Sequence, residues 1–173
     1  MIKKLIFYFA LFYSIGTLAN GNDHLNALET CLFQRSLIDG VNYSPIDTGV
    51  MITDDSYSES GEARYVEYNG SSVGYGESKL GAAFYNNKKF YPLSKSKVIE
   101  TGLPIKTVPK EIDYSVSEWG SISVGNKRFI CVNVPFPGVG QSGKHQDIRN
   151  LFVYDINGGE IYYTVGDVNS KVQ

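Results

Sequence analysis

The segment from Gly138 to His145 holds the residue types that phosphate binding would need. It reads G-V-G-Q-S-G-K-H and satisfies the first seven positions of the pattern G-x-x-x-x-G-K-[ST], whose last hydroxyl coordinates a magnesium ion. His145 stands in place of that hydroxyl. Pro135 and Pro137 precede the segment, where a strand would have to lead into a helix. The sequence therefore argues against a nucleotide site.

Hydrolytic chemistry has little support either. Ser142, His145 and Asp147 are the residue types of a serine-hydrolase triad, but triad members converge from separate elements beside an oxyanion site. The chain has only two histidines, whereas a zinc site takes three or four ligands. We therefore predict no catalytic residue, no metal and no cofactor, and we expect a protein that is not an enzyme.

A polar loop over Pro135–Asn150 is the best candidate for a site of another kind. Loops longer than about 12–15 residues are uncommon unless they are functional or disordered. The alternative is an ordinary surface excursion. We predict that the polar side chains of this loop contact a partner and catalyse nothing; they are Gln141, Lys144, His145, Asp147 and Arg149.

The first nineteen residues have the pattern of a signal peptide. Lys3 and Lys4 precede an uncharged apolar run from Leu5 to Ile15, and small residues follow at Thr17 to Ala19. The run is shorter than the roughly 20 apolar residues of a spanning helix. We expect cleavage after Ala19 rather than a stable membrane anchor, and hence a periplasmic or secreted protein.

A single domain over residues 20–173 is expected after cleavage, since domains commonly run to about 100–150 residues. Cys31 and Cys131 are its two cysteines, and in an oxidising compartment they predict one disulfide. Closing a loop of about 100 residues is worth roughly 4–5 kcal/mol in the chain-entropy model. The alternative is a pair of free thiols, but nothing basic flanks Cys131 closely enough to suggest a thiolate.

A helix is predicted over residues 22–38. Asn22 or Asp23 can cap its first turn, and Leu25, Leu28 and Leu32 recur at helical spacing. Gly40 is the expected stop. After residue 40 the pattern changes to strands and turns.

The last third of the chain contains the strongest strand signals. Arg128–Val134 is apolar on both faces, which predicts a central strand covered on two sides. Hairpin turns are expected at Asn86-Asn87, at Gly125-Asn126 and at Asn157–Gly159. The fold class predicted is mainly β (α+β): a single antiparallel sheet or sandwich domain with one N-terminal helix, stapled by the disulfide.

The export pattern, the long polar loop, the abundant tyrosine and the lack of a catalytic constellation together point to a binding protein. The chain has 16 basic and 18 acidic residues and no basic patch, which argues against a nucleic-acid partner. It resembles in general character the small exported immunity and lysozyme-inhibitor proteins of Gram-negative bacteria, although no motif identifies one family. That likeness implies a partner protein, such as a secreted toxin or hydrolase. The alternative is a small envelope hydrolase or glycan-binding module, in which tyrosines and Trp119 would stack on sugar rings.

Overall fold

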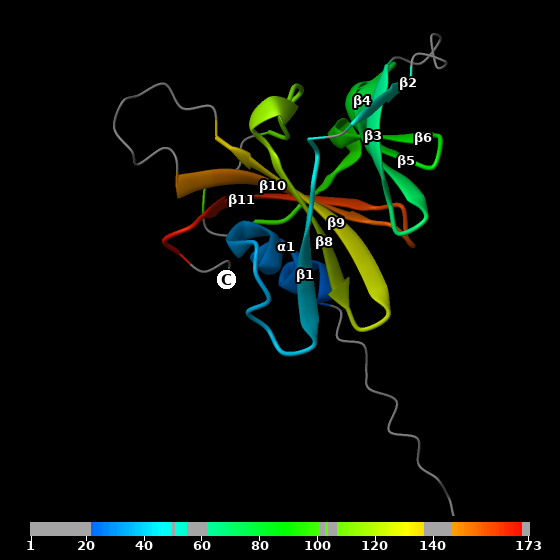
Figure 1. The fold of residues 1–173 in the computed structure, drawn as a ribbon. Helices are drawn as coiled ribbons and strands as arrows, with labels where there is room; N and C mark the ends of the chain where they lie inside the picture. Colours follow the sequence, from blue (N-terminus) through cyan, green and yellow to red (C-terminus); the bar gives the residue numbers. More distant parts are fainter. Residues whose placement is uncertain are drawn as a thin grey trace, which may run out of the picture.

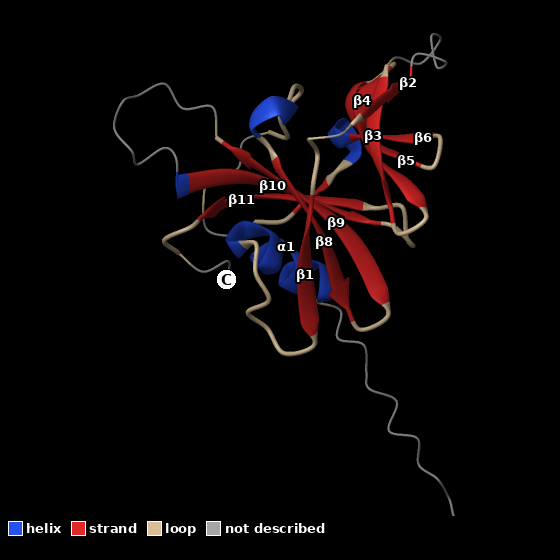
Figure 2. Ribbon diagram, in the orientation of Figure 1, coloured by secondary structure: helices blue, strands red, loops and turns tan. Residues whose placement is uncertain are grey.

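A computed structural model describes residues 22–49, 51–54, 62–100, 103, 107–136 and 147–170. The described residues form one α-helix and two β-sheets (Figure 1). Strands account for most of the regular structure (Figure 2). The predicted mainly-β fold with one N-terminal helix is therefore confirmed.

The elements follow one another along the chain as α1 Asp23–Phe33, β1 Val41–Ile46, β2 Ile52–Asp54, β3 Ala63–Tyr68, β4 Ser71–Ser78, β5 Gly81–Asn86, β6 Lys89–Pro92, β7 Lys97–Val98, β8 Glu118–Val124, β9 Lys127–Pro135, β10 Ile148–Asp155 and β11 Ile161–Asp167. Two 3₁₀ turns, η1 Leu93–Lys95 and η2 Tyr114–Val116, lie between strands.

The strands form a six-stranded sheet in the order β1-β8-β9-β10-β11-β7 and a five-stranded sheet in the order β2-β3-β4-β5-β6. Each neighbouring pair is antiparallel except β11 and β7, which run parallel. An apolar core fills the space between the sheets, and α1 covers the other face of the six-stranded sheet (Figure 1). Of the two predicted architectures, a single sheet and a sandwich, the structure thus has the sandwich of two sheets, with antiparallel pairing except at β7.

Strand β9 lies in the interior of the six-stranded sheet and is covered on both faces, as the sequence predicts. Phe129 and Cys131 pack against the helix, whereas Ile130, Val132 and Val134 belong to the core between the sheets. Because successive side chains of a strand point to opposite faces, one apolar run contributes to two cores.

The predicted disulfide between Cys31 and Cys131 is present, with 5.5 Å between the Cα atoms. It joins the last turn of α1 to the centre of β9. Beside it, the Asn133 side-chain amide donates to the carbonyl oxygens of Cys31 at 3.1 Å and of Leu32 at 3.3 Å. These bonds satisfy carbonyls that a helix end leaves unpaired.

The helix is shorter than the predicted range of 22–38. It ends at Phe33 because Gln34 adopts a left-handed conformation (φ 52°) and donates its backbone N–H to the Thr30 carbonyl. Gly40 is therefore not the stop. Asn22 occupies the N-cap position, but its side chain makes no capping hydrogen bond.

The three hairpin turns are found close to their predicted positions. Gly125-Asn126 joins β8 to β9, and residues 156–160 join β10 to β11. The β5–β6 turn lies one residue later than predicted, at Asn87 and Lys88, both with positive φ. Asn86 stays in β5 because its amide donates to the buried Tyr154 hydroxyl at 3.2 Å.

Candidate functional site

The predicted contact loop connects two neighbouring strands. Pro135, the last residue of β9, pairs with Arg149 of β10, and the Phe136 N–H donates to the Ile148 carbonyl at 2.9 Å. The connection therefore runs from 136 to 147, so the predicted bounds Pro135–Asn150 are too wide. Its two ends lie side by side.

Three of the five predicted contact residues, Gln141, Lys144 and His145, lie outside the described residues. Asp147 is at the loop end, where its carbonyl accepts the Val168 N–H at 2.9 Å. Arg149 belongs to β10, and its Nε is shielded from solvent with no hydrogen-bond partner in the part of the chain that the structure describes. The structure therefore places two of the residues at the root of the loop.

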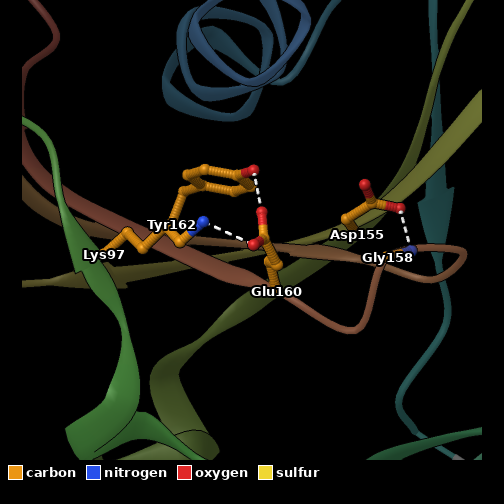
Figure 3. A network of polar contacts seen from close by, with 5 residues as sticks. All are labelled: Lys97, Asp155, Gly158, Glu160 and Tyr162. Atoms are coloured by element: carbon orange, nitrogen blue, oxygen red, sulfur yellow. Dashed lines mark hydrogen bonds and ion pairs between the residues drawn. The ribbon is translucent and has the colours of Figure 1, made fainter.

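A polar network joins β7 to the start of β11 (Figure 3), and a ring contact extends it to the first turn of α1. One oxygen of the Glu160 carboxylate accepts a hydrogen bond from the Lys97 ammonium, and the other accepts one from the Tyr162 hydroxyl. His24 stacks on the Tyr162 ring, with 4.6 Å between centroids and 12° between planes. The network fastens the start of the helix to the sheet edge.

Its electrostatics favour a structural role. Hydrogen bonds from Lys97 and Tyr162 lower the pKa of Glu160, and burial together with the Glu160 bond raises the pKa of Tyr162. Both groups thus keep their usual charge states at neutral pH. General acid–base catalysis needs a pKa near the working pH, which neither group has.

Protonation of His24 is expected to lower the stability of the fold in mild acid. Burial, followed by the nearby positive charge of Lys127, lowers the pKa of His24 below its ordinary value of 6.5. The unfolded chain therefore binds protons more readily, and the unfolding free energy falls as pH drops through about 6.5. Urea unfolding at pH 7.5 and 5.5 should show this loss in the native chain and a smaller loss in His24→Gln.

Glu160→Gln is the matched control for that experiment. Since Glu160 raises the pKa of His24, its removal should preserve or increase the loss between pH 7.5 and 5.5. An equal pH dependence in the native chain and His24→Gln would contradict the assignment to His24.

A cleft of about 730 Å³ opens at one end of the five-stranded sheet. Its floor is formed where β3 begins, β4 ends and β5 begins, and the connector from Val108 to Tyr114 bounds the other side. Ligand clefts commonly measure about 300–1,000 Å³. The volume is therefore large enough for a ligand or a peptide segment.

The wall of the cleft combines aromatic and charged groups. Tyr75 and Tyr114 stack face to face, with 3.7 Å between ring centroids and 8° between planes. Arg64 forms an ion pair with Glu62 at 2.7 Å. Burial raises the pKa of Tyr114, which keeps its hydroxyl protonated at neutral pH.

Sequence reasoning missed this cleft because its residues come from three strands and a connector and form no motif. The available signal was weak: Pro109 marks 104–109 as a connector rather than a strand. Only the folding of β3, β4 and β5 into one sheet brings these residues opposite the connector.

Trp119 and several of the tyrosines lie in the core. Trp119 is 3 % exposed and donates its indole N–H to Ser117 at 2.8 Å, and Tyr85, Tyr154 and Tyr163 are also buried. These four rings are not available to stack on a sugar, whereas the half-buried Tyr75 and Tyr114 lie at the cleft.

Within the described ranges, no group of three or more metal-ligating side chains is close enough to hold an ion. None of the helices in those ranges has the length and apolar character needed to cross a bilayer. Comparisons with protein-family models, with curated proteins and with solved structures found no match.

Proposed function

We propose that the protein is an exported inhibitor or immunity-type protein, which neutralises an envelope-targeting enzyme or toxin by inserting a surface loop. The observation that supports this proposal is the way the loop over 137–146 is held. The residues that flank it, Phe136 and Ile148, are hydrogen-bonded to each other, and β9 and β10 are two of the strands whose side chains contribute to both cores.

Fixed loop ends matter for affinity because a loop loses conformational entropy when it binds. A loop whose ends are fixed by a well-packed scaffold loses less freedom when it enters a cleft, so more of the contact energy becomes affinity. Strand β9 is fixed by the Cys31–Cys131 disulfide, and the loop end at Asp147 is bonded to Val168. In this proposal Gln141, Lys144, His145, Asp147 and Arg149 make the contacts.

The proposed location is the periplasm or the extracellular space. The disulfide is compatible with an oxidising compartment, where such bonds persist. Met1 to Ala19 would serve as the cleaved signal peptide.

The test replaces residues 138–145 by a Gly-Ser linker of equal length. This keeps Phe136, Asp147 and their hydrogen bonds, so the scaffold should retain its thermal unfolding midpoint. Both proteins are expressed in full with their own leader and used to capture partners from an envelope extract. The captured enzyme is then assayed for hydrolysis of purified peptidoglycan.

We expect the native protein to capture an enzyme and inhibit it, and the linker variant to bind at least about 100-fold more weakly, a difference of roughly 2.7 kcal/mol. Lys88→Gly, in the distant β5–β6 turn, is the matched control and should bind normally. Equal affinity of the linker variant would contradict the loop hypothesis. Hydrolysis of peptidoglycan by the protein alone would contradict the inhibitor function.

A further inference from the structure

We propose that the cleft between β3–β5 and the connector Val108–Tyr114 binds a basic peptide segment, with a lysine or arginine side chain inserted into it. The inference deepens the proposed function, since it gives a chemical character to part of the partner. It uses none of the residues between 137 and 146, so it can be tested separately.

The walls of the cleft suit a long aliphatic stem. Apolar side chains line it from both the sheet and the connector: Leu80, Ala82, Val108, Pro109 and Ile112. Leu80 is 56 % exposed, so its apolar side chain is open to contact by a ligand. Lysine and arginine side chains cover apolar surface with their methylene groups while their charged ends stay near water or a counter-charge.

The charges at the cleft favour a cation. Arg64 is already paired with Glu62. Glu77, Glu111 and Lys110 also line the cleft, and none of them makes an ion pair within the ranges that the structure describes. The carboxylates of Glu77 and Glu111 thus outnumber the single ammonium group of Lys110. The cleft therefore keeps a net negative charge, which favours an incoming cation.

The volume of the cleft favours a peptide segment over a single small cation as the ligand. About 730 Å³ exceeds what one side chain fills, so flanking backbone can enter as well. The connector approaches the start of β5 closely, because a Cβ on Gly81 would lie 3.8 Å from the Lys110 carbonyl oxygen. That carbonyl is a hydrogen-bond acceptor at the edge of the cleft and suits a guanidinium or peptide N–H.

The cleft also lies at the same end of the sandwich as the loop root. The connector leads through η2 into the first residue of β8, Glu118, which pairs with Asn133 near the end of β9 (Figure 1). A partner held by the loop would therefore find the cleft on the adjoining surface.

The experiment is an NMR titration of the ¹⁵N-labelled protein with acetyl-Gly-Arg-Gly-amide and with the same peptide carrying citrulline. Citrulline keeps the shape of arginine but has no charge. We expect saturable shifts at the amides of Tyr75, Ala82 and Ile112 with the arginine peptide, and binding at least about 10-fold weaker with the citrulline peptide. Binding should also weaken as salt is raised.

Variants assign the effect to the cleft. Glu77→Gln with Glu111→Gln should weaken arginine-peptide binding about 10-fold, a change of roughly 1.4 kcal/mol. Asp39→Asn, an exposed carboxylate outside the cleft, should leave it unchanged. If the double variant fails to fold, Glu111→Gln alone, on the connector, carries the same test with a smaller expected loss.

Equal binding of the citrulline peptide, shifts confined to residues outside the cleft, or no saturable shift would each overturn the proposal. Tighter binding of acetyl-Gly-Glu-Gly-amide or of chitotriose would do so as well. The 138–145 linker variant should bind the arginine peptide as the native protein does. Failure of the loop hypothesis is therefore distinguishable from failure of this one.

Discussion

Replacing Cys31 and Cys131 by alanine is expected to lower the unfolding free energy by about 2–5 kcal/mol. The bond closes a chain segment with a sequence separation of 100 residues, and such a large loop gains much conformational freedom in the unfolded state when the bond is absent. It also holds α1 against β9, where both cysteines are fully buried. Urea unfolding at pH 7.5 measures the loss.

The reduced native chain is the matched comparison for that variant. Native protein in reductant and the double alanine variant should have similar unfolding midpoints, both well below that of the oxidised protein. An oxidised protein no more stable than either would show that packing between α1 and the sheet suffices by itself. In that case Asn133 and the apolar contacts of the helix would carry the attachment.

Gly74→Ala is expected to destabilise the protein by about 3 kcal/mol or more, at or above the upper end of usual overpacking costs. Gly74 pairs with Tyr65 across the β3–β4 ladder. An added Cβ would lie 1.9 Å from the Arg64 carbonyl oxygen and 2.6 Å from the Tyr65 Cα. These are backbone atoms, so no side-chain rotation relieves the contact and the two strands must separate.

The same substitution should disturb the cleft, because Arg64 and Tyr75 lie next to the two residues that are forced apart. Gly49→Ala is the matched control. Gly49 is exposed, and among the described residues its added Cβ would meet only the Asp47 side chain, at 3.1 Å from the carboxylate oxygen. We expect a change within about 0.5 kcal/mol for the control. Thermal and urea unfolding that ranked the two variants equally would contradict this reading of the β3–β4 contact.

Much of the fold could be predicted from local patterns. Strand β9 is recognisable because both of its faces are apolar, and the turn at Gly125-Asn126 is recognisable because Gly125 accepts positive φ without strain. The disulfide follows from having two cysteines in a chain with an export pattern. The strand and the turn are specified by residues that are close together in sequence. The disulfide could be predicted because two cysteines allow only one intramolecular pairing.

Predictions that depended on distant residues were less accurate. The helix ends at Phe33, five residues before the predicted end, where Asn133 of β9 bonds to its last carbonyls. Asn86 stays in β5 because Tyr154 of the other sheet accepts its amide. At both boundaries a residue far away in sequence adds hydrogen bonds to a local conformation, which at the helix end is the left-handed Gln34.

The same distinction between local patterns and long-range contacts applies to the candidate sites. The sequence by itself determined the loop between β9 and β10, the disulfide and the expectation of export, because these are properties of composition, spacing and turn chemistry. Only the tertiary structure decided that the strands form two sheets, that Trp119 and three tyrosines are buried, and that a cleft opens beside the connector. The physical reason is that strand pairing and burial depend on contacts between residues far apart in sequence, which no local periodicity specifies.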